Sequence, residues 1–120
     1  PRTTEQTRLL IGPDAGWFQV DDSPPVDLRR TRNNRRLLAV LVERSLSGLP
    51  GLTIPELVAA VWPGQRILER AARHRVHVAV SALRRAGLAE LLLHTTAGYT
   101  LAVPGGIRLS EESDPVGLTA

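Results

Sequence analysis

The spacing of apolar and polar positions changes in character along the chain. Near the start, short apolar runs at residues 9–11 and 17–20 are closed by segments rich in Gly, Pro and Asp, at 12–14 and 21–25. Short apolar runs bounded by such residues predict β-strands, and residues 26–29 allow a third. We expect these strands to form a small antiparallel sheet that leans on helices for its stability.

The middle of the chain has helical periodicity. Apolar residues recur every three or four positions over 34–46, which predicts a first helix. Residues 53–56, Thr-Ile-Pro-Glu, have the form of a capping box and predict the start of a short second helix over about 54–61. A third helix is expected over 69–86, with Gly87 as its C-cap.

Extended segments return after the third helix. Two runs at 91–95 and 99–103 flank a turn with a glycine and predict a β-hairpin. The chain is therefore divided into N-terminal strands (1–30), a helical core with a hairpin (31–103) and a C-terminal tail or linker (104–120). This order predicts an α+β winged helix-turn-helix fold: a small N-terminal antiparallel sheet, three helices and a C-terminal hairpin as the wing.

Composition narrows the classes of protein that fit. A length of 120 residues suits one domain, and the absence of cysteine excludes disulfides and thiolate metal sites. No apolar run reaches the roughly 20 residues of a membrane span, and no signal peptide is visible. We expect a soluble, cytoplasmic protein. Methionine is absent as well, which leaves open whether these residues belong to a longer chain.

Charge is distributed unevenly. Residues 66–86 hold six arginines against one acid, Glu69, and residues 29–36 hold five arginines and no acid. Acidic residues gather instead toward the two ends of the chain. Such asymmetry favours a polyanionic partner that meets one face of the molecule.

A helical wheel separates residues 69–86 into two faces. The apolar sector consists of Ala72, Val76, Ala79, Val80, Leu83 and Ala86. The opposite face carries Arg70, Arg73, His74, His77, Ser81, Arg84 and Arg85, with Val78 at its edge. This face has no acid, whereas a solvated face usually mixes charges that pair one turn apart. Because arginine suits guanine edges and valine suits thymine methyl groups, the face predicts contact with the DNA major groove; a merely solvated basic face is the alternative.

A second basic cluster leads into the first helix. Its members, Arg29, Arg30, Arg32, Arg35 and Arg36, are expected to neutralise DNA phosphates beside the groove. The alternative is a solubilising cluster that pairs with Asp22 or Asp27.

Catalytic patterns are missing from the chain. It has no nucleophile–base–orienter set, no phosphate-binding loop and no carboxylate pair with an evident role. His74 and His77 have a spacing that can bind a metal, but cysteine is absent and no carboxylate shares their face. We therefore expect no enzyme activity, metal, cofactor or small-molecule substrate.

Three stretches carry a family resemblance. Residues 76–85, Val-His-Val-Ala-Val-Ser-Ala-Leu-Arg-Arg, are similar to a V-x-V-x-I-S-x-L-R-x-K pattern, and residues 94–101, His-Thr-Thr-Ala-Gly-Tyr-Thr-Leu, approach T-x-x-G-x-G-Y-x-L. The Glu-Leu and Val-Trp pairs within 56–62 fit an E-L…V-W pattern. Together they resemble the C-terminal effector domain of OmpR/PhoB-type response regulators, which are bacterial transcription regulators. In element order the resemblance covers about residues 8–103.

The resemblance implies the winged-helix fold, with a wing that meets the minor groove. It implies base or phosphate contacts from Arg73, His74, His77, Ser81 and Arg84, and contacts to the DNA backbone near Thr95 and Thr96. The N-terminal region is short for the family's four-stranded sheet.

Two hypotheses about function follow. The first is sequence-specific binding of double-stranded DNA in transcriptional control, with the helix at 69–86 in the major groove. The alternative is a winged-helix module that docks proteins within a larger signalling or regulatory protein. A homodimer and additional domains stay open in both.

Overall fold

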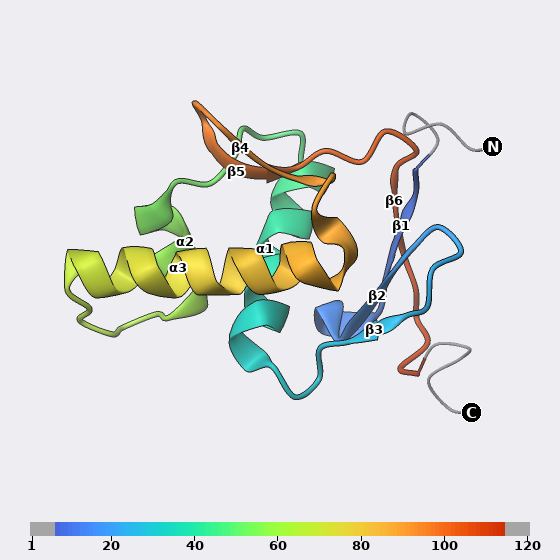
Figure 1. Cartoon of the computed structure of the whole chain (residues 1–120), viewed down its shortest axis with the longest axis horizontal. Coiled ribbons are helices and arrows are strands. Elements are labelled where there is room, and N and C mark those ends of the chain that lie inside the picture. Colours follow the sequence, from blue (N-terminus) through green and yellow to red (C-terminus); the bar gives the residue numbers. More distant parts are fainter. Residues whose placement is uncertain (1–6, 115–120) are drawn as a thin grey trace.

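Three helices lie beside a four-stranded sheet and beneath a β-hairpin, so the chain has an α+β architecture (Figure 1). The computed structural model describes residues 7–114. The helices are α1 (Arg32–Leu46), α2 (Ile54–Val61) and α3 (Glu69–Leu83). The strands of the sheet are β1 (Leu9–Ile11), β2 (Trp17–Val20), β3 (Val26–Asp27) and β6 (Ile107–Leu109). The strands of the hairpin are β4 (Leu92–Thr95) and β5 (Gly98–Leu101).

One hydrophobic core joins the sheet, the helices and the hairpin. Its fully buried side chains come from each of these parts and include Leu9, Phe18, Leu37, Leu57, Leu83 and Leu92. Strands of two to four residues are too short to be stable alone. The sheet is therefore stabilised by packing against the helices, as the sequence predicts.

The helices follow the predicted pattern with small shifts at their ends. The bounds of α2 are those predicted, and α1 begins at Arg32 rather than at 34. The prediction for the end of α3 is wrong, because the α-helix stops at Leu83 and residues 84–88 form a wider π turn. Gly87 lies inside that turn with a φ of 138°, a conformation that glycine adopts readily.

The start of α2 confirms the predicted capping box. The Thr53 hydroxyl accepts a hydrogen bond from the Glu56 N–H at 3.3 Å, and the Thr53 N–H donates to Glu56 Oε1 at 2.9 Å. Arg44 Nη2 of α1 lies 3.1 Å from the second carboxylate oxygen, Glu56 Oε2. The first turn of α2 is thereby tied to α1.

These contacts make the stability of the fold depend on the ionisation of Glu56. The hydrogen bond from the Thr53 backbone lowers the pKa of this carboxyl most, and Arg44 lowers it further. A lowered pKa stabilises the fold above the pKa of the unfolded chain, and the contribution is lost as the pH falls through the folded-state pKa. We expect Glu56→Gln to melt below wild type at pH 7, with a gap that narrows as the pH falls toward 3. Thermal unfolding across that range measures the gap, with Glu90→Gln as an exposed control; a gap that does not change with pH would contradict the account.

The sheet is mixed, where the sequence analysis predicts an antiparallel one. Its strand order is β3-β2-β1-β6, and β6 pairs with β1 in parallel, with Leu9 opposite Ile107. The prediction of a tail is therefore wrong for residues 107–109, which supply the fourth strand. Residues 115–120 of the predicted tail and residues 1–6 of the predicted N-terminal unit lie outside the described residues.

Trp17 holds the segment that follows β6 against the sheet. Its indole N–H donates a 2.8 Å hydrogen bond to the Glu112 carbonyl, and its side chain is buried. The ring lies directly over Gly12, where a Cβ would come within 2.2 Å of the indole nitrogen. Arg29 pairs with Asp114 and with Asp27, which adds an ionic tie between this segment and β3. The end of the described chain thus closes the sheet on the side away from α3.

Candidate functional site

α3 is oriented by its apolar stripe. Ala72, Val76, Ala79, Val80 and Leu83 are buried against α1 and α2, as the wheel predicts, and Ala86 lies half-buried in the turn that follows. Burying a valine or leucine side chain contributes about 1.5–3 kcal/mol relative to leaving it in water. The stripe therefore determines which face of α3 points outward.

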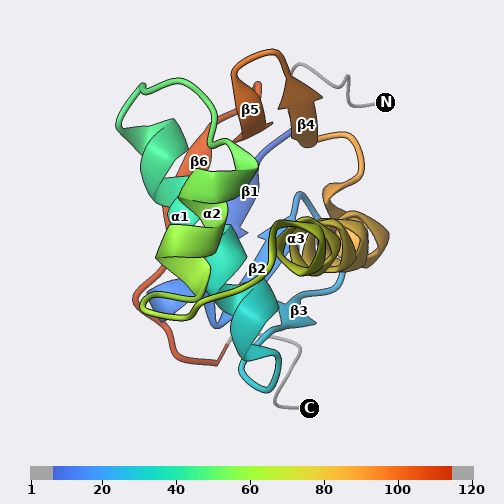
Figure 2. The same ribbon diagram turned by 90° about the vertical axis from the view of Figure 1, so that its left-hand side faces the viewer.

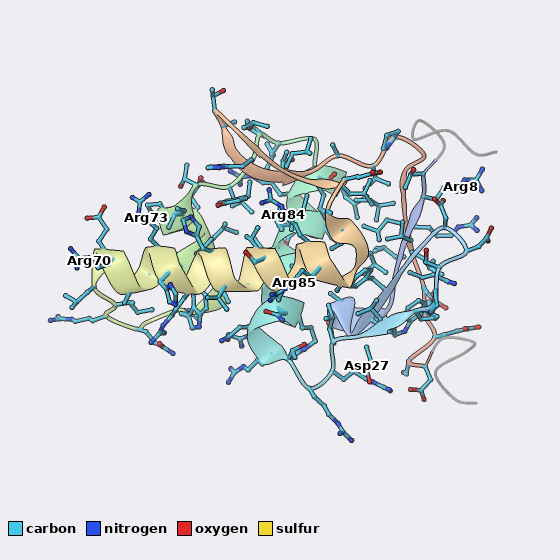
Figure 3. All side chains as sticks on the ribbon, in the orientation of Figure 1. Arg8, Asp27, Arg70, Arg73, Arg84 and Arg85 are labelled. Atoms are coloured by element: carbon cyan, nitrogen blue, oxygen red, sulfur yellow. The ribbon has the colours of Figure 1, made fainter. Side chains whose placement is uncertain are left out.

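The outward face of α3 gathers most of the predicted site residues. Its exposed side chains are Arg70, Arg73, His74, His77, Ser81 and Arg85. Val78 lies among them with 52% of its surface exposed. Arg70 and Arg73 project near the start of the helix, and Arg85 lies beyond its end (Figure 3). The structure thus brings these residues onto one continuous surface about the length of the helix.

One acid, Glu69, lies beside the outward face and contacts it through Arg73. Glu69, in the first turn, places Oε1 3.7 Å from Nη2 of Arg73. Both side chains are largely exposed, and an exposed pair of this kind contributes little to stability. Glu69 therefore offsets one positive charge of the face, while Arg73 remains free to turn toward a stronger anionic partner.

Two arginines of this region are held by other parts of the fold. Arg84 is half-buried and donates from Nε and Nη2 to the Leu92 carbonyl of β4, at 3.2 and 3.1 Å. Arg75 donates to Gln65 Oε1 and lies over the Trp62 ring, 5.7 Å from its centroid. Arg84 was predicted among the outward contacts, but the structure aims its guanidinium at the hairpin.

The predicted threonines lie at the tip of the hairpin. Thr95 Oγ1 donates to the Gly98 carbonyl at 3.2 Å and accepts from the Ala97 N–H at 3.1 Å, which shapes the turn. Thr96 is exposed in the turn itself. The hairpin extends above α3 in both views of the molecule (Figures 1 and 2).

A third extended segment joins the hairpin, and the sequence analysis missed it. Leu52 and Tyr99 exchange two backbone hydrogen bonds of 2.8 Å, so the residue before the α2 cap pairs with β5. The one signal for this contact in the sequence is Gly51, where a Cβ would lie 2.8 Å from the Tyr99 carbonyl. Tyr99 is buried, and its ring stacks on His94 with a centroid distance of 4.2 Å. The turn end of the hairpin is thereby attached to the segment before α2.

The basic cluster at the start of α1 is only partly free. Arg36 donates from Nη1 to the Val61 carbonyl at the end of α2, at 3.2 Å. Arg32 is exposed and Arg35 half-buried, and neither pairs with an acid among residues 7–114. The alternative of pairing with Asp27 describes Arg29, which lies 3.0 Å from that carboxylate and lowers its pKa. The first turn of α1 lies on the opposite side of α3 from the hairpin (Figure 1).

Comparison of the chain with family models, with curated proteins and with solved structures gives no match. Within residues 7–114, no helix has the length and apolar character needed to cross a membrane. The same part of the chain contains no group of three His, Asp or Glu side chains arranged to hold a metal ion.

Proposed function

We propose that this chain is a winged-helix module that binds double-stranded DNA in transcriptional control, with α3 in the major groove and the β4–β5 hairpin as its wing. The observation that carries the proposal is the outward face of α3. Three arginines, two histidines, a serine and a valine share this exposed surface, with Glu69 as the one acid beside it. The apolar stripe of α3 is buried against the core, so a partner that binds this helix must contact its outward face.

The dimensions and chemistry of α3 support this partner. An α-helix with its side chains is about 10–12 Å across, and the major groove of B-DNA is about 12 Å wide. Arg70 and Arg73 can donate two parallel hydrogen bonds to guanine, and Val78 offers an apolar contact for a thymine methyl group. Contact with another apolar group removes the exposed Val78 side chain from water, which is favourable. A thymine methyl group is such a partner.

We expect two regions beside α3 to contact the DNA phosphates on either side of the major groove. The wing lies on one side of the helix, and the start of α1, whose first turn contains Arg32 and Arg35, lies on the other (Figures 1 and 2). Arginine, threonine and backbone N–H groups are the usual phosphate ligands in protein–DNA complexes. We assign Thr95, Thr96, Arg32 and Arg35 to phosphate contacts, and Arg36 to the support of α2.

One observation favours the alternative of protein docking. An apolar groove of about 490 Å³ runs between α2 and α3, with Trp62 and Ile67 among its walls. The next residue in the chain, Leu68, is 83% exposed. An exposed leucine beside an apolar groove is typical of a surface that binds protein.

The dependence of binding on salt separates these two functions. Each phosphate that is neutralised adds about −0.9 to the slope of log K against log salt concentration. Arg32 and Arg35, the two arginines assigned to phosphates, predict a slope of roughly −1.8 for a duplex of random sequence. Fluorescence anisotropy between 50 and 300 mM salt measures it. Absence of duplex binding at 50 mM salt would favour the docking function instead.

A further inference from the structure

Arg84 makes the hydrogen bonds that tie the end of α3 to the wing. Its Nε and Nη2 both donate to one acceptor, the Leu92 carbonyl in the first residue of β4. In the part of the chain that the structure describes, no other hydrogen bond runs from residues 69–88 to the two strands of the wing. No acid pairs with Arg84 in that part either. The interaction is thus a charged fork on a single backbone oxygen.

The backbone hydrogen-bonding pattern changes at the same residue, while Arg84 itself keeps helical φ and ψ of −62° and −45°. Arg84 follows the last residue of α3 and opens the π turn that ends at Leu88. Turns of this kind are rare and are frequently found at functional sites. The chain then reverses through the Leu91–Leu88 backbone hydrogen bond and enters β4. The Arg84 fork therefore closes the loop that connects the DNA-facing helix to the wing.

The remaining attachments of the wing lead to other elements. Leu52, just before α2, pairs with β5, and Ser45 Oγ of α1 donates to the Leu101 carbonyl at 3.1 Å. These contacts hold β5 near both of its ends, whereas in the described residues β4 is hydrogen-bonded to α3 only through the Arg84 fork. A hinged wing would lose freedom when it meets DNA, and that loss would weaken binding.

We infer that Arg84 is a positioning residue, which sets the wing at the angle where wing and α3 can touch DNA together. The role of this link in DNA binding rests on the proposed function, whereas the link between α3 and the wing is itself a property of the free protein. It also reassigns Arg84, whose position in the sequence predicts a direct DNA contact.

Arg85 provides a matched control. It is the next residue, carries the same charge and is exposed, without a hydrogen bond to the wing. Arg84→Ala is expected to speed amide hydrogen exchange in β4 and β5 of the free protein by about tenfold, the loss of one charged hydrogen bond of roughly 1.5 kcal/mol. Exchange in α1 and α2 should stay unchanged. Arg85→Ala should leave exchange in the wing at the wild-type rate.

A second variant and a DNA measurement complete the test. Arg84→Lys keeps one donor, so exchange in the wing should fall between wild type and alanine. On a bound duplex, Arg84→Ala should lose hydroxyl-radical protection at the edge contacted by the wing and keep protection at the centre. Wing exchange equal in Arg84→Ala and wild type would overturn the positioning role. Faster wing exchange in Arg84→Ala, together with no duplex binding by wild type, would uphold the link and overturn the DNA function.

Discussion

Gly98→Ala is expected to lower the free energy of unfolding by about 3 kcal/mol or more. Gly98 has a φ of 116°, a region that side-chain-bearing residues occupy only with strain of about 1–3 kcal/mol. A Cβ here would also lie 2.3 Å from the Leu52 carbonyl oxygen. Because that oxygen accepts the Tyr99 N–H, relief of the clash requires the bridge between the wing and the α2 cap to open.

Two other glycines separate the two causes. Gly48 has a φ of 69° with open space around it, so Gly48→Ala measures backbone strain without a clash. Gly51 has no positive φ but faces the Tyr99 carbonyl at 2.8 Å, so Gly51→Ala measures the clash without that strain. Urea unfolding of the three variants should give the largest loss for Gly98→Ala. A loss no larger than that of Gly48→Ala would mean that the bridge to Leu52 is not tight.

Local signals in the sequence were sufficient for the helices. The capping box at Thr53 and the apolar stripe from Ala72 to Leu83 are each patterns within one continuous segment of chain, and both are observed. The outward face of α3 follows from the stripe, since burial of one side of a helix exposes the other. The hairpin was predictable for a similar reason, because its strands are separated only by Thr96 and Ala97.

Contacts between distant segments were not predictable in the same way. β6 is three residues long with Arg108 in its centre, and its partner β1 lies at the other end of the chain. Nothing near residue 107 signals that pairing. The bridge from Leu52 to Tyr99 and the fork from Arg84 to Leu92 are likewise visible only once the elements are packed. Arg84 illustrates what this means for predicting function. Residue type and spacing alone do not distinguish a side chain that contacts a partner from one that positions another element of the fold.

The double substitution Arg70→Ala/Arg73→Ala is expected to remove most of the affinity for DNA. Both guanidiniums lie on the outward face at the start of α3, away from the core. A direct contact to a base is worth about 1–3 kcal/mol, so two of them predict a loss of about 30-fold or more. The fold should be unaffected, because neither side chain is buried and the lost pair with Glu69 is weak.

A matched pair elsewhere controls for net charge. Arg8 and Arg108 lie together on the sheet, and Arg8 is at the end of the molecule far from α3 (Figure 3). Arg8→Ala/Arg108→Ala removes the same two charges from a surface that has no part in the proposed interface. Its affinity for DNA should stay within about twofold to threefold of wild type, the change expected from long-range attraction alone.

The most direct test of DNA recognition by α3 is the dissociation constant of these three proteins for one fluorescent duplex at 50 mM salt. We expect tight binding by wild type, nearly the same affinity for Arg8→Ala/Arg108→Ala, and a loss of about 30-fold or more for Arg70→Ala/Arg73→Ala. Equal losses in the two double variants, or no binding by wild type, would contradict DNA recognition by α3.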